Sequence, residues 1–303
     1  MLTASLAFAT MGVCVKFGSQ HFSSGELVFY RGIVGVVCMF VWARRLKISL
    51  KTKVPLMHLW RTTVGAISLS AWFYALAHLS IATAMTLNYM SSIWLTAFIA
   101  FGALFFGHNK QTQHHGLQAP LVFAVLVGFV GVMLVLRPAF EQGQELAGFI
   151  GLLSGFVAAF AYLQVTALAR KGEPEVRTVF YFALGTVVIG LFSMGLTGTS
   201  PWPSWESKAA LWLVPIGLLA SVGQVCMTRA YSSGQTLLAA SLQYMGIVFS
   251  ALFGLLLFSE QIPAMAWLGM ALIITSGIGA TILRSRAMQS ASAQPVSTPA
   301  EEF

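Results

Sequence analysis

The sequence predicts an all-α integral membrane protein in which ten transmembrane helices form two inverted five-helix repeats around a central cavity. Three observations lead to this prediction: the composition, the number of long apolar runs, and a short internal repeat. Of the 303 residues, 57% are hydrophobic and only 9% are charged. Soluble domains carry about 25% charged residues, so this chain could not cover a water-exposed surface with polar groups.

The apolar runs have the length of membrane spans, since a helix needs about 20 mostly apolar residues to cross the hydrocarbon core. The expected spans are 2–19, 25–43, 60–79, 82–106, 120–137, 147–169, 177–197, 208–230, 235–258 and 264–284. No soluble domain fits between them. The tail 287–303 is rich in Ser, Ala and Pro, a composition that predicts a disordered segment.

Two stretches half a chain apart repeat one pattern. Residues 84–91 and 239–246 both read A-x-[S/T]-L-[N/Q]-Y-M-[S/G]. An amide beside a phenol is costly in hydrocarbon unless it faces a partner or a cavity. We therefore expect a duplicated unit, with a first repeat at 1–140 and a second at 141–286. Because each has five spans, the second enters the membrane inverted, as in transporters that alternate access about a midplane site.

Charges predict the orientation of the chain. Lys and Arg outnumber acidic residues 17 to 9, and most basic residues, Arg61 among them, fall on the side that carries the loops after spans two, four, six and eight. The positive-inside rule then places both termini in the cytoplasm. Since the basic residues separate apolar runs instead of following one face, topology explains them better than a nucleic-acid partner does.

No catalytic, metal or cofactor site is predicted. Cys14, Cys38 and Cys226 lie in apolar runs without metal-ligand spacing. The chain has no Asp and no HExxH motif, which argues against a membrane enzyme, because such chemistry needs convergent acids, a metal triad or a Ser/His pair.

The candidate substrate-binding residues are aromatic and amide side chains inside the spans, which can stack on flat groups and hydrogen-bond polar ones. The alternative is that they join helices, since Asn and Gln bond across spans for about 1–2 kcal/mol. The first candidates come from the repeated pattern and the others from spans three, six and eight: Asn88, Tyr89, Gln243, Tyr244, Trp72, Tyr74, Tyr162 and Gln224.

Two cations inside the expected spans complete the candidate set. Lys16 lies near the outer end of span one and Arg31 about two turns inside span two. An intramembrane charge costs about 2.5–3.5 kcal/mol on insertion scales and is a functional hypothesis by default. Both could bind a substrate carboxylate or phosphate. Alternatively both extend to the outer interface, or Arg31 pairs with Glu26.

Two further stretches carry a family resemblance. They are residues 75–84, which read ALAHLSIATA and lead into span four, and residues 253–260, which read FGLLLFSE and end span nine. Over residues 1–286 the chain resembles the EamA-type members of the drug/metabolite transporter superfamily. The first half departs from the pattern at 105–108, where His108 stands in place of the family's frequent Glu.

The resemblance implies a bacterial inner (plasma) membrane protein with a central cavity lined by spans one, three, four, six, eight and nine. It further implies transport of small polar metabolites, amino-acid-like or vitamin-like, without ATP. Secondary transport or exchange by alternating access is the leading hypothesis. A proton-coupled drug/metabolite exporter and a non-transporting scaffold or auxiliary subunit are the alternatives. The expected partners are the metabolite and the bilayer, and a monomer and a homodimer are both compatible with the sequence.

Overall fold

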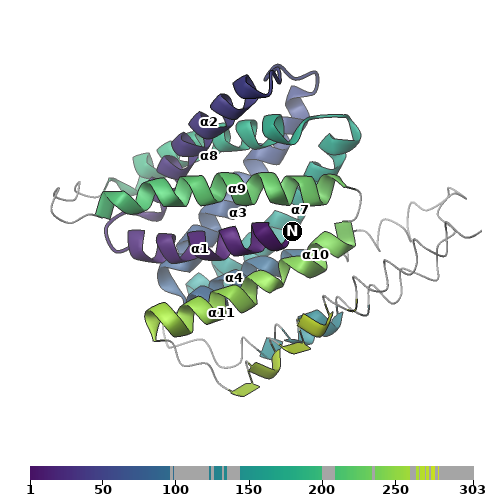
Figure 1. The fold of residues 1–303 in the computed structure, drawn as a ribbon. Helices are drawn as coiled ribbons and strands as arrows, with labels where there is room; N and C mark the ends of the chain where they lie inside the picture. Colours follow the sequence, from purple (N-terminus) through teal and green to yellow (C-terminus); the bar gives the residue numbers. More distant parts are fainter. Residues whose placement is uncertain are drawn as a thin grey trace, which may run out of the picture.

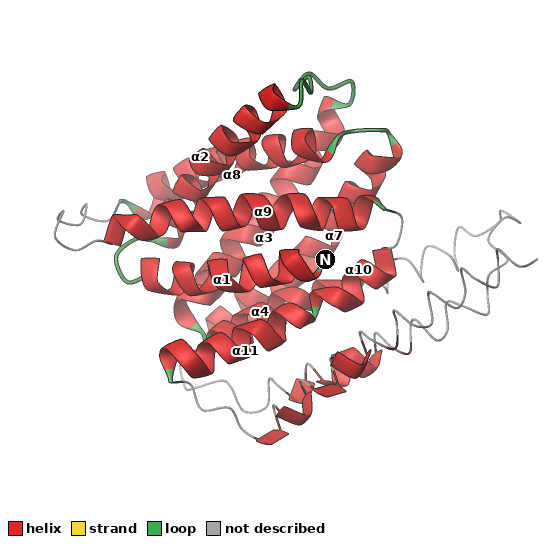
Figure 2. Ribbon diagram, viewed as in Figure 1, coloured by secondary structure: helices red, strands yellow, loops and turns green. Residues whose placement is uncertain are grey.

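The structure is a computed structural model. This structure describes residues 1–95, 144–199, 209–233 and 236–259, with scattered positions at 98–134 and 264–279. Within these residues the chain is helical and contains no strand (Figure 2). The helices are α1 (Leu2–Gly18), α2 (Ser24–Arg45), α3 (Pro55–His78), α4 (Ile81–Tyr89), α7 (Glu145–Arg170), α8 (Glu175–Thr197), η2 (Ala209–Trp212), α9 (Leu213–Ser232), α10 (Thr236–Gln243) and α11 (Met245–Phe258).

Several expected features fall outside the described residues. These are the tail 287–303, Glu260 and His108, and about half of the residues in the expected spans 120–137 and 264–284. The expected count of ten spans therefore stays a prediction.

The protein is an integral membrane protein. Five helices within the described residues are long and apolar enough to cross a bilayer: Ser24–Arg45, Glu145–Arg170, Glu175–Gly195, Ala209–Ser232 and Leu238–Phe258. Large apolar side chains point outward from them, for example Val188 at 61% and Phe192 at 68% exposure on α8. In water such a surface would be an association site, whereas in a bilayer it faces lipid.

Local sequence signals explain where α2 and α3 begin. Ser23 and Glu26 form a capping box in which each side chain accepts a hydrogen bond from the other residue's backbone N–H. Pro55 starts α3, a position that suits proline because no N–H is needed there. The helix thus begins five residues before the expected start at 60, and Arg61 lies well inside it.

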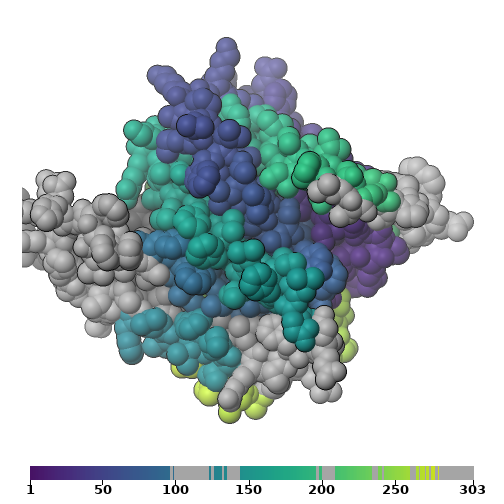
Figure 3. Space-filling model, turned by 180° about the vertical axis from the view of Figure 1, so that it is seen from behind, coloured from purple at the N-terminus to yellow at the C-terminus, as the bar shows by residue number. Residues whose placement is uncertain are grey.

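The helices pack in pairs that combine elements from the two expected repeats. The closest pairs are α2 with α8, α3 with α7, and α1 with α9. In Figure 1, α9 and α1 run side by side above α10 and α11, while α2 and α8 cover the opposite side. From behind, α3 (blue) and α7 (teal) occupy neighbouring parts of the surface (Figure 3). Helix α3 therefore packs against both α7 and α8.

Both copies of the repeated pattern contain an interruption in a helix. α4 ends at Tyr89, and helix resumes at residues 91–95 after a turn at Met90. α10 ends at Gln243, and α11 begins at Met245 (Figure 1). Breaks of this kind inside a membrane are tolerated where the backbone is buried in protein. The amide and phenol of each copy lie at that break.

Candidate functional site

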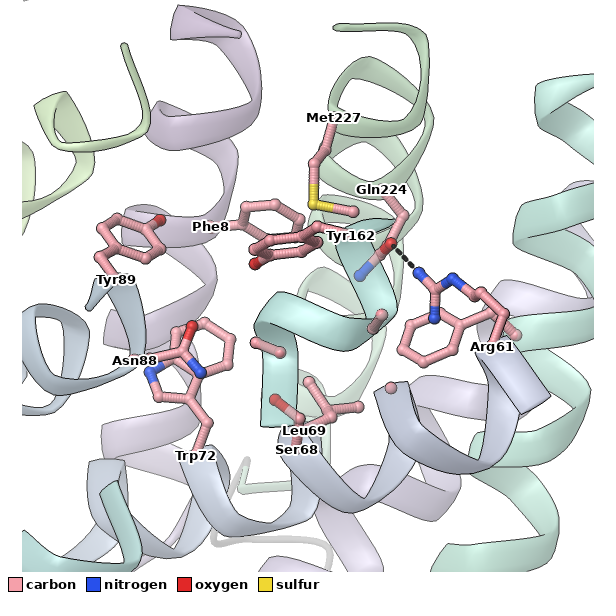
Figure 4. Close-up of a pocket in the computed structure, with 14 residues that line it drawn as sticks. Phe8, Arg61, Ser68, Leu69, Trp72, Asn88, Tyr89, Tyr162, Gln224 and Met227 are labelled. Carbon is pink, nitrogen blue, oxygen red and sulfur yellow. Dashed lines mark hydrogen bonds between the residues drawn. The ribbon is translucent and has the colours of Figure 1, made fainter. Parts of the chain in front are cut away.

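A small interior cavity of about 50 Å³ lies where six helices meet (Figure 4). Its walls come from α1, α3, α4, α7, α8 and α9. The lining residues are Phe8, Arg61, Gly65, Ser68, Leu69, Trp72, Asn88, Tyr89, Ala158, Ala161, Tyr162, Phe182, Gln224 and Met227. Since about 10–15 Å³ suffices for one water, this space holds a few waters but not a metabolite.

One stripe of α3 supplies much of the wall. Arg61, Gly65, Ser68 and Trp72 are spaced by three or four residues, which places them on one face of a helix. All four are turned away from lipid, with Arg61 only 2% exposed. Figure 4 shows Arg61 at one end of the cavity and Trp72 toward the other.

Asn88 joins α4 to α7 at the cavity wall. Its Nδ2 donates to Oγ of Ser154 at 3.0 Å. The hydroxyl of Ser68 donates to the backbone carbonyl of Ser154 at 2.8 Å, which joins α3 to the same place. The close approach of α4 and α7 requires Gly155, because a Cβ there would meet the backbone carbonyl oxygens of Leu87 and Asn88. Asn88 thus lines the cavity and also holds the helices together.

Gln243 connects two tyrosines that stack on each other. The rings of Tyr162 and Tyr231 lie 5.0 Å apart at an interplanar angle of 16°. Tyr231 donates its hydroxyl hydrogen to Oε1 of Gln243 at 2.8 Å, and Nε2 of Gln243 donates to the Tyr162 hydroxyl oxygen at 3.4 Å. The amide of the second repeated pattern therefore fixes the ring of Tyr162, which lines the cavity.

Five of the predicted residues line the cavity: Trp72, Asn88, Tyr89, Tyr162 and Gln224. Gln243 does not line the cavity, but its side chain hydrogen-bonds to Tyr162, which does. The hydroxyl of Tyr89 is buried and has no hydrogen-bond partner among the described residues, and its ring packs where Gly246 leaves room.

The other four predicted residues lie outside the cavity lining. Tyr244 is fully buried, with its ring against Gly128. Tyr74 stacks on His78 at 4.2 Å. Lys16 donates to the backbone carbonyl of Leu79. Arg31 is buried beside the ring of Phe182 and makes no ion pair with Glu26, so that alternative for Arg31 does not hold.

Sequence reasoning did not single out Phe8, Arg61, Phe182 or Met227 as cavity residues. Arg61 was assigned to the basic cytoplasmic side because the span was expected to start at 60. The signal that could have found it is Pro55, since proline favours the first turn of a helix. Phe8, Phe182 and Met227 carry no signal of their own, because apolar residues are expected throughout a span.

Comparison with known proteins identifies the family. The model of the EamA-like transporter family matches residues 146–282. The chain is 31% identical over 280 residues to the pseudopaline exporter CntI of Pseudomonas aeruginosa, covering 91% of this chain and 92% of that protein. This chain belongs to the EamA-like transporter family. The resemblance found in the sequence is confirmed, and the EamA chain is a small-metabolite transporter, not an enzyme.

More distant relatives of this EamA chain carry different names. A riboflavin transporter of Rhizobium johnstonii is 26% identical over 282 residues, covering 92% of this chain and 88% of its own. An S-adenosylmethionine uptake transporter of Rickettsia felis is 23% identical, covering 82% and 79%. A crystal structure at 18% identity matches 94% of this chain and 96% of its own, with a TM-score of 0.74, which shows the fold alone.

Proposed function

We propose that this chain is a secondary transporter or exchanger that carries a small polar organic metabolite, amino-acid-like or vitamin-like, across the bacterial inner membrane. The observation that carries the proposal is the cavity, which is lined by six helices of both expected halves and receives amide, phenol and guanidinium groups from α3, α4, α7 and α9. A scaffold has no need of buried amide, phenol and guanidinium groups that face a common space, since such groups are costly in a membrane.

The mechanism we propose is alternating access between two inverted halves, 1–140 and 141–286. The expected repeats make α1 correspond to α7, α2 to α8 and α3 to α9. Under this correspondence, contacts between the halves have counterparts, which supports the proposal. The packing of α3 on α7 corresponds to that of α9 on α1, and the packing of α3 on α8 corresponds to that of α9 on α2. The interruptions after Tyr89 and after Gln243 lie one residue apart in the repeated pattern, an arrangement similar to that of transporters with broken helices at the substrate site.

The cavity must widen before a metabolite can enter, because ligand pockets usually measure about 300–1,000 Å³. Two sets of contacts between helices, both outside the cavity lining, are the proposed gates. We call the first the polar latch: Thr52, His58 and Arg177 all donate hydrogen bonds to the carboxylate of Glu173.

The second set is an aromatic stack at the far end of α1. Phe17 lies 4.9 Å from the ring of Trp212 and 4.9 Å from that of Phe258. It connects α1 to η2 and α11. By the positive-inside rule the polar latch is cytoplasmic and the aromatic stack faces outward. Opening one while the other stays closed would expose the cavity to one side at a time.

Uniport or exchange is favoured over proton coupling. Proton relays use carboxylates or histidines inside the bundle, and among the described residues none of either kind lines the cavity. Glu26 belongs to a helix cap and His78 is exposed at the end of α3. Concentrative uptake into proteoliposomes that is abolished when the pH gradient is collapsed would favour the proton-coupled exporter instead.

The proposal is tested by cross-linking the polar latch in proteoliposomes. Cys14, Cys38 and Cys226 are first replaced by Ala, and the pair His58→Cys and Glu173→Cys is introduced. A short bifunctional thiol reagent then joins α3 to the loop before α8. We expect efflux of a preloaded panel of amino acids, riboflavin and S-adenosylmethionine to stop on cross-linking and to return on reduction, because the cytoplasmic end can no longer open.

The matched control is the pair Glu173→Cys and Arg177→Cys. These residues form an i,i+4 ion pair within one segment, so joining them does not tie α3 to α8 and efflux should continue. Efflux that continues after cross-linking of residues 58 and 173 contradicts the gating mechanism. If no member of the panel moves and none stabilises the protein against heat, the scaffold alternative is favoured.

A further inference from the structure

Two arginines are buried in the bundle beside one aromatic ring. Arg31 on α2 is 3% exposed and Arg61 on α3 is 2% exposed. Their guanidinium carbons lie 5.3 Å and 4.0 Å from the centroid of Phe182 on α8. The ring offers each cation a weak attraction of about 0.5–2 kcal/mol, which is small beside the cost of burying a charge.

Neither arginine has a carboxylate partner among the described residues. Glu173 pairs with His58 and Arg177, and Glu175 pairs with the exposed Arg229. Two buried positive charges near one ring repel each other, and neither has a counter-ion within the part of the chain that the structure describes. Because a buried charge is normally paired, this arrangement is incomplete without an anion.

The guanidinium of Arg61 has donors to spare. One N–H, on Nη2, donates to Oε1 of Gln224 at 3.4 Å. Nε and Nη1 are buried and have no partner among the described residues, and the same holds for Nε of Arg31. Guanidinium N–H groups only donate. The missing partner must therefore be an acceptor, and next to two cations an anionic acceptor is the strongest.

Gly65 makes room for this arginine. It lies one turn after Arg61, and a Cβ at that position would collide with Nη1 of Arg61 and come within 3.0 Å of the Phe182 ring. The guanidinium thus lies between Gly65 of α3, which has no side chain, and the aromatic ring of Phe182. This placement directs the Arg61 side chain toward the cavity. A long cationic side chain near a helix end otherwise extends to the membrane interface.

We propose that Arg61 binds the carboxylate of the transported metabolite, and that the cargo is therefore an organic acid or a zwitterion. Arg31 lies beside Phe182 but does not line the cavity, so it adds positive potential without touching the ligand. A planar carboxylate suits the single guanidinium that reaches the cavity, and the aromatic walls at Trp72 and Tyr162 suit the organic part. This inference rests on the proposed function, since it assumes that the cavity is the transport site.

The test is the melting temperature of the purified full chain with benzoate and succinate, against their neutral counterparts benzamide and succinamide and against inorganic phosphate at equal ionic strength. At about ten times Kd we expect a carboxylate to raise the melting temperature by roughly 3 °C. The amides should give no shift. Equal shifts with amides, or a shift with phosphate alone, would overturn the carboxylate assignment.

Variants test whether the carboxylate-induced rise in melting temperature depends on Arg61. Arg61→Gln should abolish it, whereas Arg229→Gln should keep it, because the Arg229 side chain is 77% exposed. Gly65→Ala retains every charge but displaces the guanidinium, so it should also lose the shift. Gly195→Ala is its matched control, since a Cβ there meets nothing within 4 Å. A full carboxylate response in Arg61→Gln or Gly65→Ala rules the site out.

The protein without ligand gives a second readout. Removing a buried charge that has no counter-ion should stabilise a fold, so Arg61→Met should melt above the parent. A structural role for Arg61 predicts the opposite, and a lower melting temperature counts against the proposal. In proteoliposomes, efflux that is equal in the parent and Arg61→Gln refutes the carboxylate site but leaves the transporter intact. Absence of efflux and of any ligand shift in the parent instead refutes the proposed function.

Discussion

Glu173, in the loop between α7 and α8, lies 3.0 Å from Nε2 of His58 on α3, and the carboxylate accepts a hydrogen bond from that nitrogen. Burial of the carboxyl disfavours its charged form. Hydrogen bonds from Arg177, His58 and Thr52 outweigh that effect, so the pKa of Glu173 lies below its ordinary value. The Glu173 carboxyl is therefore ionised at neutral pH, and the polar latch joins segments 115 residues apart.

The first prediction concerns the pH dependence of stability. A carboxyl whose pKa is lower in the folded than in the unfolded chain stabilises the fold above the unfolded pKa, about 4.3 for Glu. That stabilisation is lost as the pH falls through the folded pKa. We expect the parent to melt above Glu173→Gln at neutral pH, and the gap to close as the pH falls from the unfolded pKa through the lower folded pKa. Scanning fluorimetry across this range measures the difference.

Glu175→Gln is the matched control for this pH series. Its carboxylate lies 3.7 Å from the exposed Arg229, and a solvent-screened pair of this kind contributes at most about 1 kcal/mol. We expect Glu175→Gln to stay close to the parent throughout. A constant gap between the parent and Glu173→Gln at every pH would show that ionisation of Glu173 does not stabilise the latch.

The second prediction concerns the contact between α4 and α7. Gly155→Ala introduces a Cβ against the backbone carbonyls of Leu87 and Asn88, which cannot move aside as a side chain can. We expect a loss of about 1–3 kcal/mol, typical of overpacking, seen as a lower melting temperature. Gly195→Ala, which adds a methyl group in open space, should leave it unchanged. Equal melting temperatures for both variants would contradict the close contact.

How far the sequence predicts this site can be judged from the repeated pattern. The amide and phenol of both copies were expected in the interior, and Asn88, Tyr89, Gln243 and Tyr244 are all at most 6% exposed. Their polarity in an apolar run requires this. Which face each would turn to could not be predicted, because the helices break directly after Tyr89 and around Tyr244, and a break alters the rotation of neighbouring side chains.

Arg61 illustrates a second limit of sequence reasoning. The positive-inside rule treats a basic residue near a span end as a cytoplasmic marker, and Arg61 is the second residue of the expected span. Its burial depends on Phe182, which is 121 positions away in the sequence, and on the space left by Gly65. The spacing of residues along the sequence shows neither the contact with Phe182 nor the space at Gly65. The burial of Arg61 is therefore seen only once α3 is packed against α8.

The third prediction is an energetic coupling between Gln243 and Tyr231. Gln243→Leu leaves the buried hydroxyl of Tyr231 without its acceptor, and Tyr231→Phe leaves Oε1 of Gln243 without its donor. We expect each single variant to lose about 1 kcal/mol, and the double variant to lose clearly less than the sum. Denaturant titration in detergent measures all four proteins. Strictly additive losses would indicate that the 2.8 Å hydrogen bond contributes nothing.

The fourth prediction separates Lys16 from Arg61, two cations that could each have been taken for the substrate site. Lys16 donates to the backbone carbonyl of Leu79, the residue that caps the end of α3. Lys16→Met removes a charged hydrogen bond to a helix end, so we expect a loss of about 1.5–3 kcal/mol with an unchanged response to benzoate. Arg61→Met should do the reverse, raising the melting temperature and losing the response. If Lys16→Met loses the benzoate shift while keeping the parent's stability, the anion site lies at the end of α1 and not beside Phe182.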